Sequence, residues 1–211
     1  DRYSLCRTYG AVTLCLAETG DTNPRLLACI DSFLAIAQRP KRVPYYIKSF
    51  YVSLAYFRLR RYEKTTRDTR AKDRSELLEA LKLLGDAASV PFFKCHYHAI
   101  LAGLNRIDGD LTRARKEISI CEEMSHDVNG AWALYESTRQ KAHLLWGEGN
   151  TAGAMLASQA ALALCIDNSW TDRARRLRME FPQLSGGQTV VPTQVIDSNT
   201  VGTWRFQQQL D

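Results

Sequence analysis

The sequence has 211 residues, of which 45% are hydrophobic, 24% are charged and 9% are aromatic. This composition excludes a disordered chain, which combines low hydrophobicity with a large net charge, as well as collagen-like and low-complexity chains. The formal net charge is only +5, and no apolar run approaches the ~20 residues of a membrane-spanning helix. A chain of this length can bury one or two cores without disulfides or a structural metal.

Apolar residues recur at helical spacing along most of the chain, which predicts an all-α body. Prolines and glycines mark the ends of nine expected helices, at about residues 3–18, 24–38, 45–62, 75–88, 91–107, 110–124, 130–146, 151–165 and 170–180. From residue 185 the composition shifts to Gln, Thr, Val and Gly. We therefore expect a helical domain over 1–184 and a linker or tail over 185–211, in which Val190–Val191 and Val195–Ile196 could form short strands.

Three predicted turns share a glycine followed by a polar residue, at Gly20, Gly109 and Gly149. Small residues recur at fixed offsets from these glycines: Thr13, Ala102 and Ala142 seven before, Ala114 and Ala154 five after, and Cys121 and Ala161 twelve after. This pattern resembles the tetratricopeptide repeat, and the resemblance implies a stack of antiparallel helix hairpins, an α-solenoid. The chain departs from the repeat in two respects, since the last two turns lie 40 residues apart rather than ~34, and His98 and Thr138 replace the usual aromatic residue.

The segment from Trp170 to Leu184 carries a narrower resemblance. It is similar to the closing stretch of helical-repeat regions in large multidomain bacterial signalling proteins of the regulatory NTPase or kinase type. That resemblance implies a fragment that acts as a scaffold between other domains. Within the segment, Trp170, Ala174, Leu177 and Phe181 fall on one helical stripe, which predicts a helix that closes the last repeat.

The repeat resemblance also implies a binding surface, because the first helix of each hairpin lines the concave face of such repeats. Its register gives six partner-binding candidates: His96, Arg106, Glu136, Arg139, His143 and Trp146. Trp and Arg dominate interface hot spots, and a residue in a groove should remain partly accessible. In the alternative interpretation Trp146 fills the core between hairpins and Arg139 is solvated.

Eight basic and three acidic residues lie between positions 58 and 74, so this run carries the whole excess of +5. Its candidate basic patch consists of Arg58, Arg60, Arg61, Lys64, Arg67 and Arg70. Together with nearby Tyr and Phe side chains, the patch could bind phosphates and stacked bases. Charge runs are more often solvated helix ends, and the sequence favours an acidic protein partner over a nucleic acid.

Recognised catalytic and cofactor-binding motifs are absent from the sequence, so we expect neither enzymatic activity nor a cofactor. Cys95-His96-Tyr97-His98 lacks a second pair of ligands at zinc spacing, and we expect no metal site. The six cysteines are scattered among apolar residues, which predicts buried free thiols and a reducing, cytoplasmic location. No signal peptide is visible at the first residues.

These observations together predict a non-catalytic module for protein–protein interaction or interdomain scaffolding. Its partner would be a protein segment or a neighbouring domain of the same polypeptide, and a second copy of the chain stays open as a partner. We expect neither a membrane nor, in the favoured interpretation, a nucleic acid as partner. A basic nucleic-acid-binding module and a regulatory domain that senses a small ligand are the two alternatives.

Overall fold

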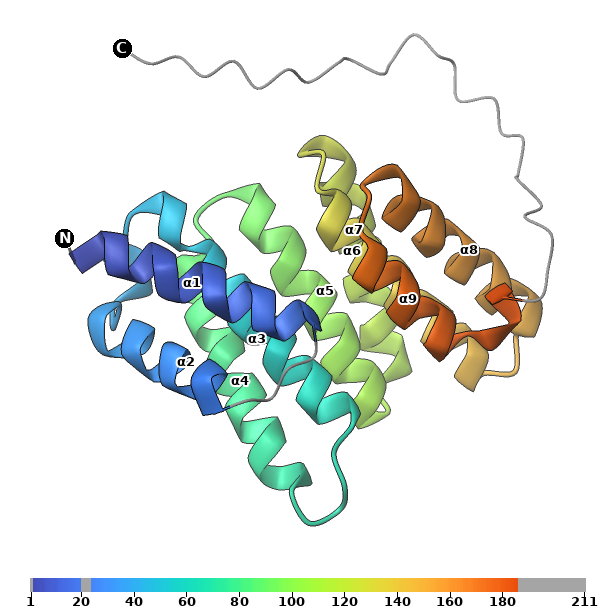
Figure 1. Cartoon of the computed structure of the whole chain (residues 1–211). Helices are drawn as coiled ribbons and strands as arrows, with labels where there is room; N and C mark the ends of the chain where they lie inside the picture. Colours follow the sequence, from blue (N-terminus) through green and yellow to red (C-terminus); the bar gives the residue numbers. More distant parts are fainter. Residues whose placement is uncertain (1, 20–23, 186–211) are drawn as a thin grey trace, which may run out of the picture.

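The computed structural model describes residues 2–19 and 24–185, and within these ranges it contains helices and turns but no strand (Figure 1). The described residues form nine α-helices: α1 (Arg2–Thr19), α2 (Pro24–Ile36), α3 (Ser49–Glu63), α4 (Arg70–Ala87), α5 (Pro91–Asp108), α6 (Leu111–Asp127), α7 (Ala131–Gly147), α8 (Thr151–Asp167) and α9 (Thr171–Glu180). Three short 3₁₀-helices accompany them: η1 (Pro40–Arg42), η2 (Tyr45–Ile47) and η3 (Pro182–Ser185). The predicted all-α class is confirmed for the described residues.

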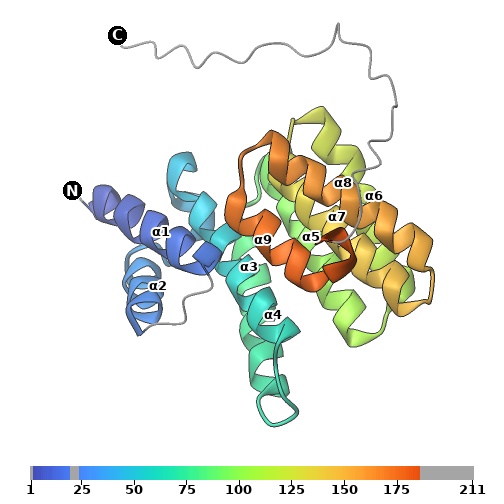
Figure 2. The same cartoon turned by 45° about the vertical axis from the view of Figure 1, so that its right-hand side comes forward.

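Consecutive helices pack in pairs, α1 with α2, α3 with α4, α5 with α6 and α7 with α8. Each odd-numbered helix also contacts the next odd-numbered helix, from α1 through α3 and α5 to α7. In Figure 2, α1 and α2 lie at one side of the molecule, α6 and α8 lie at the other, and α3 and α4 lie between them. The last helix, α9, packs mainly on α8 and also contacts α1.

Two of the three predicted glycine turns are described, and local geometry explains both. Gly109 and Gly149 adopt left-handed φ values of 87° and 78°, which a glycine accepts without strain. The following residue then caps the next helix: the Asp110 carboxylate accepts a hydrogen bond from the Arg113 amide at 3.0 Å, and the Asn150 side chain accepts one from the Gly153 amide at 2.9 Å. The turn predicted at Gly20 lies outside the described residues.

The predicted small residues lie where helices pack against each other. Ala102 and Ala114 are fully buried and belong to one apolar cluster that links α5, α6 and α7. Ala142 and Ala154, on the paired helices α7 and α8, are fully buried as well. Alanine at these positions allows the paired helices to approach each other closely.

Two predicted helix starts are wrong. The helix expected from residue 45 begins as the separate 3₁₀ turn η2, and α3 starts only at Ser49. Conversely, α4 starts five residues before the predicted position 75, at Arg70. There the Asp73 amide donates to the Thr69 carbonyl, and the Thr65 hydroxyl donates to the Asp73 carboxylate at 2.6 Å. These contacts extend the helix into the charged run.

The predicted closing stripe of α9 is confirmed. Ala174, Leu177 and Phe181 are buried in one apolar cluster with residues of α7 and α8, and Trp170 packs against that cluster. Of the predicted tail at 185–211, the structure describes only Ser185, the last residue of η3; the other positions, including the two possible strands, lie outside the described residues. None of the described helices is long and apolar enough to cross a membrane.

Candidate functional site

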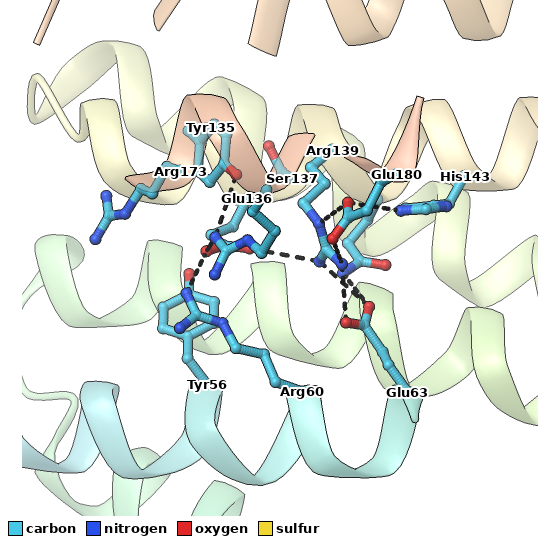
Figure 3. A network of polar contacts seen from close by, with 12 residues as sticks. Tyr56, Arg60, Glu63, Tyr135, Glu136, Ser137, Arg139, His143, Arg173 and Glu180 are labelled. Atoms are coloured by element: carbon cyan, nitrogen blue, oxygen red, sulfur yellow. Dashed lines mark hydrogen bonds and ion pairs between the residues drawn. The ribbon is translucent and has the colours of Figure 1, made fainter. Parts of the chain in front are cut away.

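A cluster of largely buried charges joins α1, α3, α5, α7 and α9, and Figure 3 shows its members on α3, α7 and α9. We call it the inter-helix charge cluster; it consists of Glu18, Arg60, Glu63, Arg106, Glu136, Arg139, Arg173, Arg176 and Glu180. At its centre, the Glu63 carboxylate of α3 accepts hydrogen bonds from Arg139 at 2.9 Å and from Arg106 at 3.0 Å. The side-chain amide of Gln140 donates to the same carboxylate at 3.1 Å.

The charge cluster holds α9 against the other odd-numbered helices. Arg173 donates to Glu18 at 2.9 Å, so the last helix is bonded to the first. Arg176 donates to the hydroxyl group of Tyr135 at 3.2 Å and lies 3.4 Å from Glu136. At the other end of α9, Glu180 accepts from Arg139 at 2.6 Å. Ion pairs of Arg173, Arg176 and Glu180 therefore hold α9 at three positions along its length.

Burial and charge oppose each other in setting the pKa values of these acids. Burial alone disfavours the carboxylate of Glu18, but the neighbouring Arg60, Arg173 and Arg176 outweigh burial and lower the Glu18 pKa from 4.5 to about 2. Glu180 behaves similarly: burial raises its pKa, Arg139 and His143 lower it, and the result is about 2. Both groups are ionised at neutral pH, as the cluster requires.

Four of the six predicted partner-binding residues belong to this cluster or its surroundings as intramolecular contacts. Glu136 and Arg139 are 1% and 4% exposed, and Arg106 is bonded to Glu63 and Gln140. His143 contacts Glu180 at 3.0 Å. Glu136, Arg139 and His143 contact residues of α9, whereas Arg106 contacts α3 and α7 and stays partly exposed together with His143.

The other two candidates differ from each other. Trp146 is 43% exposed and contacts the ring of Phe181 edge-on, so it meets the accessibility expected of a groove residue. His96 is fully buried, and its Nδ1 lies 3.1 Å from the Tyr56 hydroxyl oxygen. Burial and the charge of Arg173 lower its pKa from 6.5 to about 3, so His96 is a neutral core residue.

The neighbours of His96 in the sequence also make structural contacts. His98 lies 2.6 Å from Glu117, and the Cys95 carbonyl accepts a hydrogen bond from the Cys121 thiol. Within the described ranges no group of three or more His, Cys, Asp or Glu side chains could hold a metal ion. The six cysteines are unbridged, and Cys15 differs from the prediction because it is exposed.

Much of the candidate basic patch pairs with acidic side chains of the same chain. Arg58 and Arg61 both contact Glu76, Arg61 also contacts Asp73 at 2.7 Å, and Arg60 contacts Glu18 and Glu136. Arg70 donates to the Ile107 carbonyl and lies over the Tyr62 ring. Lys64 and Arg67 are exposed. The excess charge of the run is thus largely neutralised where the helices meet.

An open apolar groove of about 550 Å³ lies between α6, α7 and α8. Aliphatic side chains dominate its lining: Leu134, Leu145, Leu156, Ala157, Ala160 and Leu164. An ion pair between Glu122 and Lys141, at 3.1 Å, also lines it. We refer to this feature as the Leu156 groove.

The groove continues onto the solvent-facing side of α8, which carries Ala152, Leu156, Ala160, Ala163 and Ile166, all exposed. We call this row the α8 outer face. Leu156 and Ile166 are 64% and 58% exposed. The helix has no charged residue between Thr151 and Ile166, so both its packed side and its outer side are uncharged. A helix that is apolar all round is normally buried.

The sequence prediction missed the Leu156 groove and the α8 outer face. One signal for them was available, namely the sixteen residues from Thr151 to Ile166, which form most of a predicted helix and carry no charge. The groove itself could not be foreseen, because it depends on the placement of α6 and α7 beside α8.

Comparisons with known protein families, curated proteins and solved structures found no match to this chain.

Proposed function

We propose that this chain is a non-catalytic interaction module that binds a protein segment or a neighbouring domain at the Leu156 groove and the α8 outer face. The observation that carries the proposal is the exposure of Leu156 and Ile166 on a helix that has no charged residue from Thr151 to Ile166. Contiguous exposed apolar surface on a folded protein marks interaction sites. Covering it with an apolar partner surface would stabilise the complex.

The proposed module is a tetratricopeptide-like stack of hairpins. Pairwise packing of consecutive helices, two glycine turns followed by capped helices, and buried alanines at the predicted positions support this assignment. The resemblance of Trp170–Leu184 leads us to propose that the module lies between other domains of a multidomain signalling protein. Six unbridged cysteines fit a reducing compartment such as the cytoplasm.

The position of α9 supports an interaction site on α8 rather than on the helix face predicted from the repeat. Part of that face is already occupied, since Arg176 and Glu180 of α9 pair with Glu136 and Arg139 there. Nucleic-acid binding through the basic run is the weaker alternative, because intramolecular acids neutralise Arg58, Arg60 and Arg61. A partner surface must therefore be sought where apolar groups remain exposed.

A small apolar ligand is a second candidate, and the volume of the Leu156 groove favours it. About 550 Å³ lies within the ~300–1,000 Å³ range of ligand pockets, which are mostly apolar with a few polar groups. The Lys141 ammonium and the Glu122 carboxylate would supply these groups. The groove is open to solvent, which suits a protein surface better than an enclosed ligand.

Site-specific photo-crosslinking in cells tests the proposed function. A photoreactive amino acid in place of Leu156 should form crosslinks to a protein surface, and mass spectrometry should identify the attached peptide. Leu78 is the matched control, because it is an exposed leucine (41%) on α4, which packs against α3 and α5. Equal crosslinking from positions 156 and 78, or none from position 156, would refute the proposed interaction surface.

A further inference from the structure

The α8 outer face restricts the chemistry of whatever covers it. A charged group buried against an uncharged helix without a partner would lose its hydration with no compensation. The occupant must therefore present an uncharged, largely aliphatic surface along about 21 Å, which is the rise from Ala152 to Ile166, fourteen residues further on, at 1.5 Å per residue. The α8 outer face itself meets that requirement.

The order of large and small residues makes the α8 outer face complementary to a second copy of itself. In an antiparallel pair of α8 helices centred between Gln159 and Ala160, Leu156 of each copy lies opposite Ala163 of the other. In the same register Ile166 lies nearest to Ala152, the small residue at the N-terminal end of the outer face. Each large side chain thus meets a small residue, as interdigitated helix packing requires.

Charge complementarity selects the antiparallel orientation. Asp167, the only charged residue of α8, lies exposed at the C-terminal end of the helix. An antiparallel partner places the N-terminal end of its own α8 beside this carboxylate, where the helix dipole favours a negative charge. A parallel partner would instead bring two Asp167 carboxylates and two helix C-termini together, which is repulsive.

We propose that the module forms a symmetric dimer through antiparallel packing of α8 against α8 of a second copy. The inference rests on the proposed function, since it names the partner of that interaction surface. Such an interface is isologous, because the same patch of each copy forms the contact, and association therefore stops at the dimer. The Leu156 grooves beside the two helices extend the contact onto α6 and α7.

Sedimentation equilibrium of the purified chain tests the dimer. The wild-type chain should sediment as a dimer at micromolar concentrations, and Leu156→Glu should raise the dissociation constant at least a hundredfold by placing a carboxylate in the uncharged contact. Leu78→Glu adds the same charge to a distant exposed leucine and should leave the dimer intact. Because Leu156 is 64% exposed in the single chain, the variant should retain its helical circular dichroism.

Cysteine crosslinking tests the antiparallel register. In a background with Cys15→Ser and Cys29→Ser, the Ala160→Cys side chain lies next to the symmetry axis of the dimer. A short bis-maleimide should therefore crosslink it to the same position of the second copy. Ala152→Cys should not form this crosslink, because the two copies of that position would lie about 22 Å apart along the helix axis.

The outcomes separate this inference from the proposed function. A wild-type chain that stays monomeric at 200 µM would overturn the dimer, as would a dimer that resists Leu156→Glu or crosslinks through Ala152→Cys. If the chain is monomeric while position 156 crosslinks to another protein or to residues 186–211 of the same chain, the dimer fails and the interaction surface survives. If neither dimer nor crosslink forms, both fail.

Discussion

At the residue scale, the central feature is a set of buried charges that all have partners. Arg139 is 4% exposed, and it contacts Glu63, Glu136 and Glu180. Removing a single partner from such a group leaves an uncompensated charge, which costs more than the pair contributes to stability. These residues therefore fix the position of α9 more than they add free energy of folding.

His96 is predicted to make the free energy of unfolding depend on pH. Its pKa falls from 6.5 to about 3 in the folded chain because burial and Arg173 disfavour the imidazolium. As pH falls below 6.5 the unfolded chain takes up a proton that the folded chain does not, so stability decreases. The expected loss is roughly 2 kcal/mol by pH 5.

Urea denaturation between pH 7.5 and 5 checks this prediction. His96→Gln should flatten the decline of unfolding free energy relative to wild type, although it lowers the value at pH 7.5 by disturbing the contact with Tyr56. His126→Gln changes an exposed histidine and serves as the control. Parallel pH profiles for wild type and His96→Gln would contradict the assignment.

At the element scale, the approach of α5 to α3 and α7 depends on a glycine. A Cβ atom at Gly103 would lie 2.8 Å from Cδ2 of Leu59 and 3.2 Å from Cδ of Gln140. Because Leu59 is buried in the core, the clash cannot be relieved by moving it into solvent. Gly103→Ala should lower the free energy of unfolding by about 1–3 kcal/mol, as other overpacked cores do.

Gly147→Ala provides the matched control for this substitution, measured by the same denaturation experiment. A Cβ atom at Gly147 meets nothing within 4 Å, and alanine restricts the unfolded chain, so this variant should be more stable than wild type by about 0.5–1 kcal/mol. If both substitutions shift stability in the same direction, the close approach at Gly103 does not control the packing of α5.

At the scale of the whole molecule, local signals and long-range contacts differ in how well the sequence predicts them. The ends of α5, α6, α7 and α8 follow from prolines, glycines and caps within a few residues, and they were predicted closely. Arg139 was predicted as a surface residue because its partners Glu63 and Glu180 lie 76 and 41 residues away. Its burial depends on how three helices come together, which spacing along one helix does not reveal.

The ion pair between Glu18 and Arg173 joins residues 155 positions apart and connects the first helix to the last. Glu18 also contacts Arg60 of α3 at 3.2 Å. Because this carboxylate compensates two arginines that are largely buried, its loss should weaken α1 and α9 together. Contacts within the hairpin of α5 and α6 do not depend on it.

Native-state hydrogen exchange of Glu18→Gln follows this coupling amide by amide. We expect roughly ten- to hundredfold faster exchange in both α1 and α9, corresponding to about 1–3 kcal/mol of lost protection, while α6 stays unchanged. Asp86→Asn is the control, because it breaks only the exposed pair with Lys41, and such pairs contribute little. Faster exchange confined to α1 would show that the two ends of the molecule are not coupled through this carboxylate.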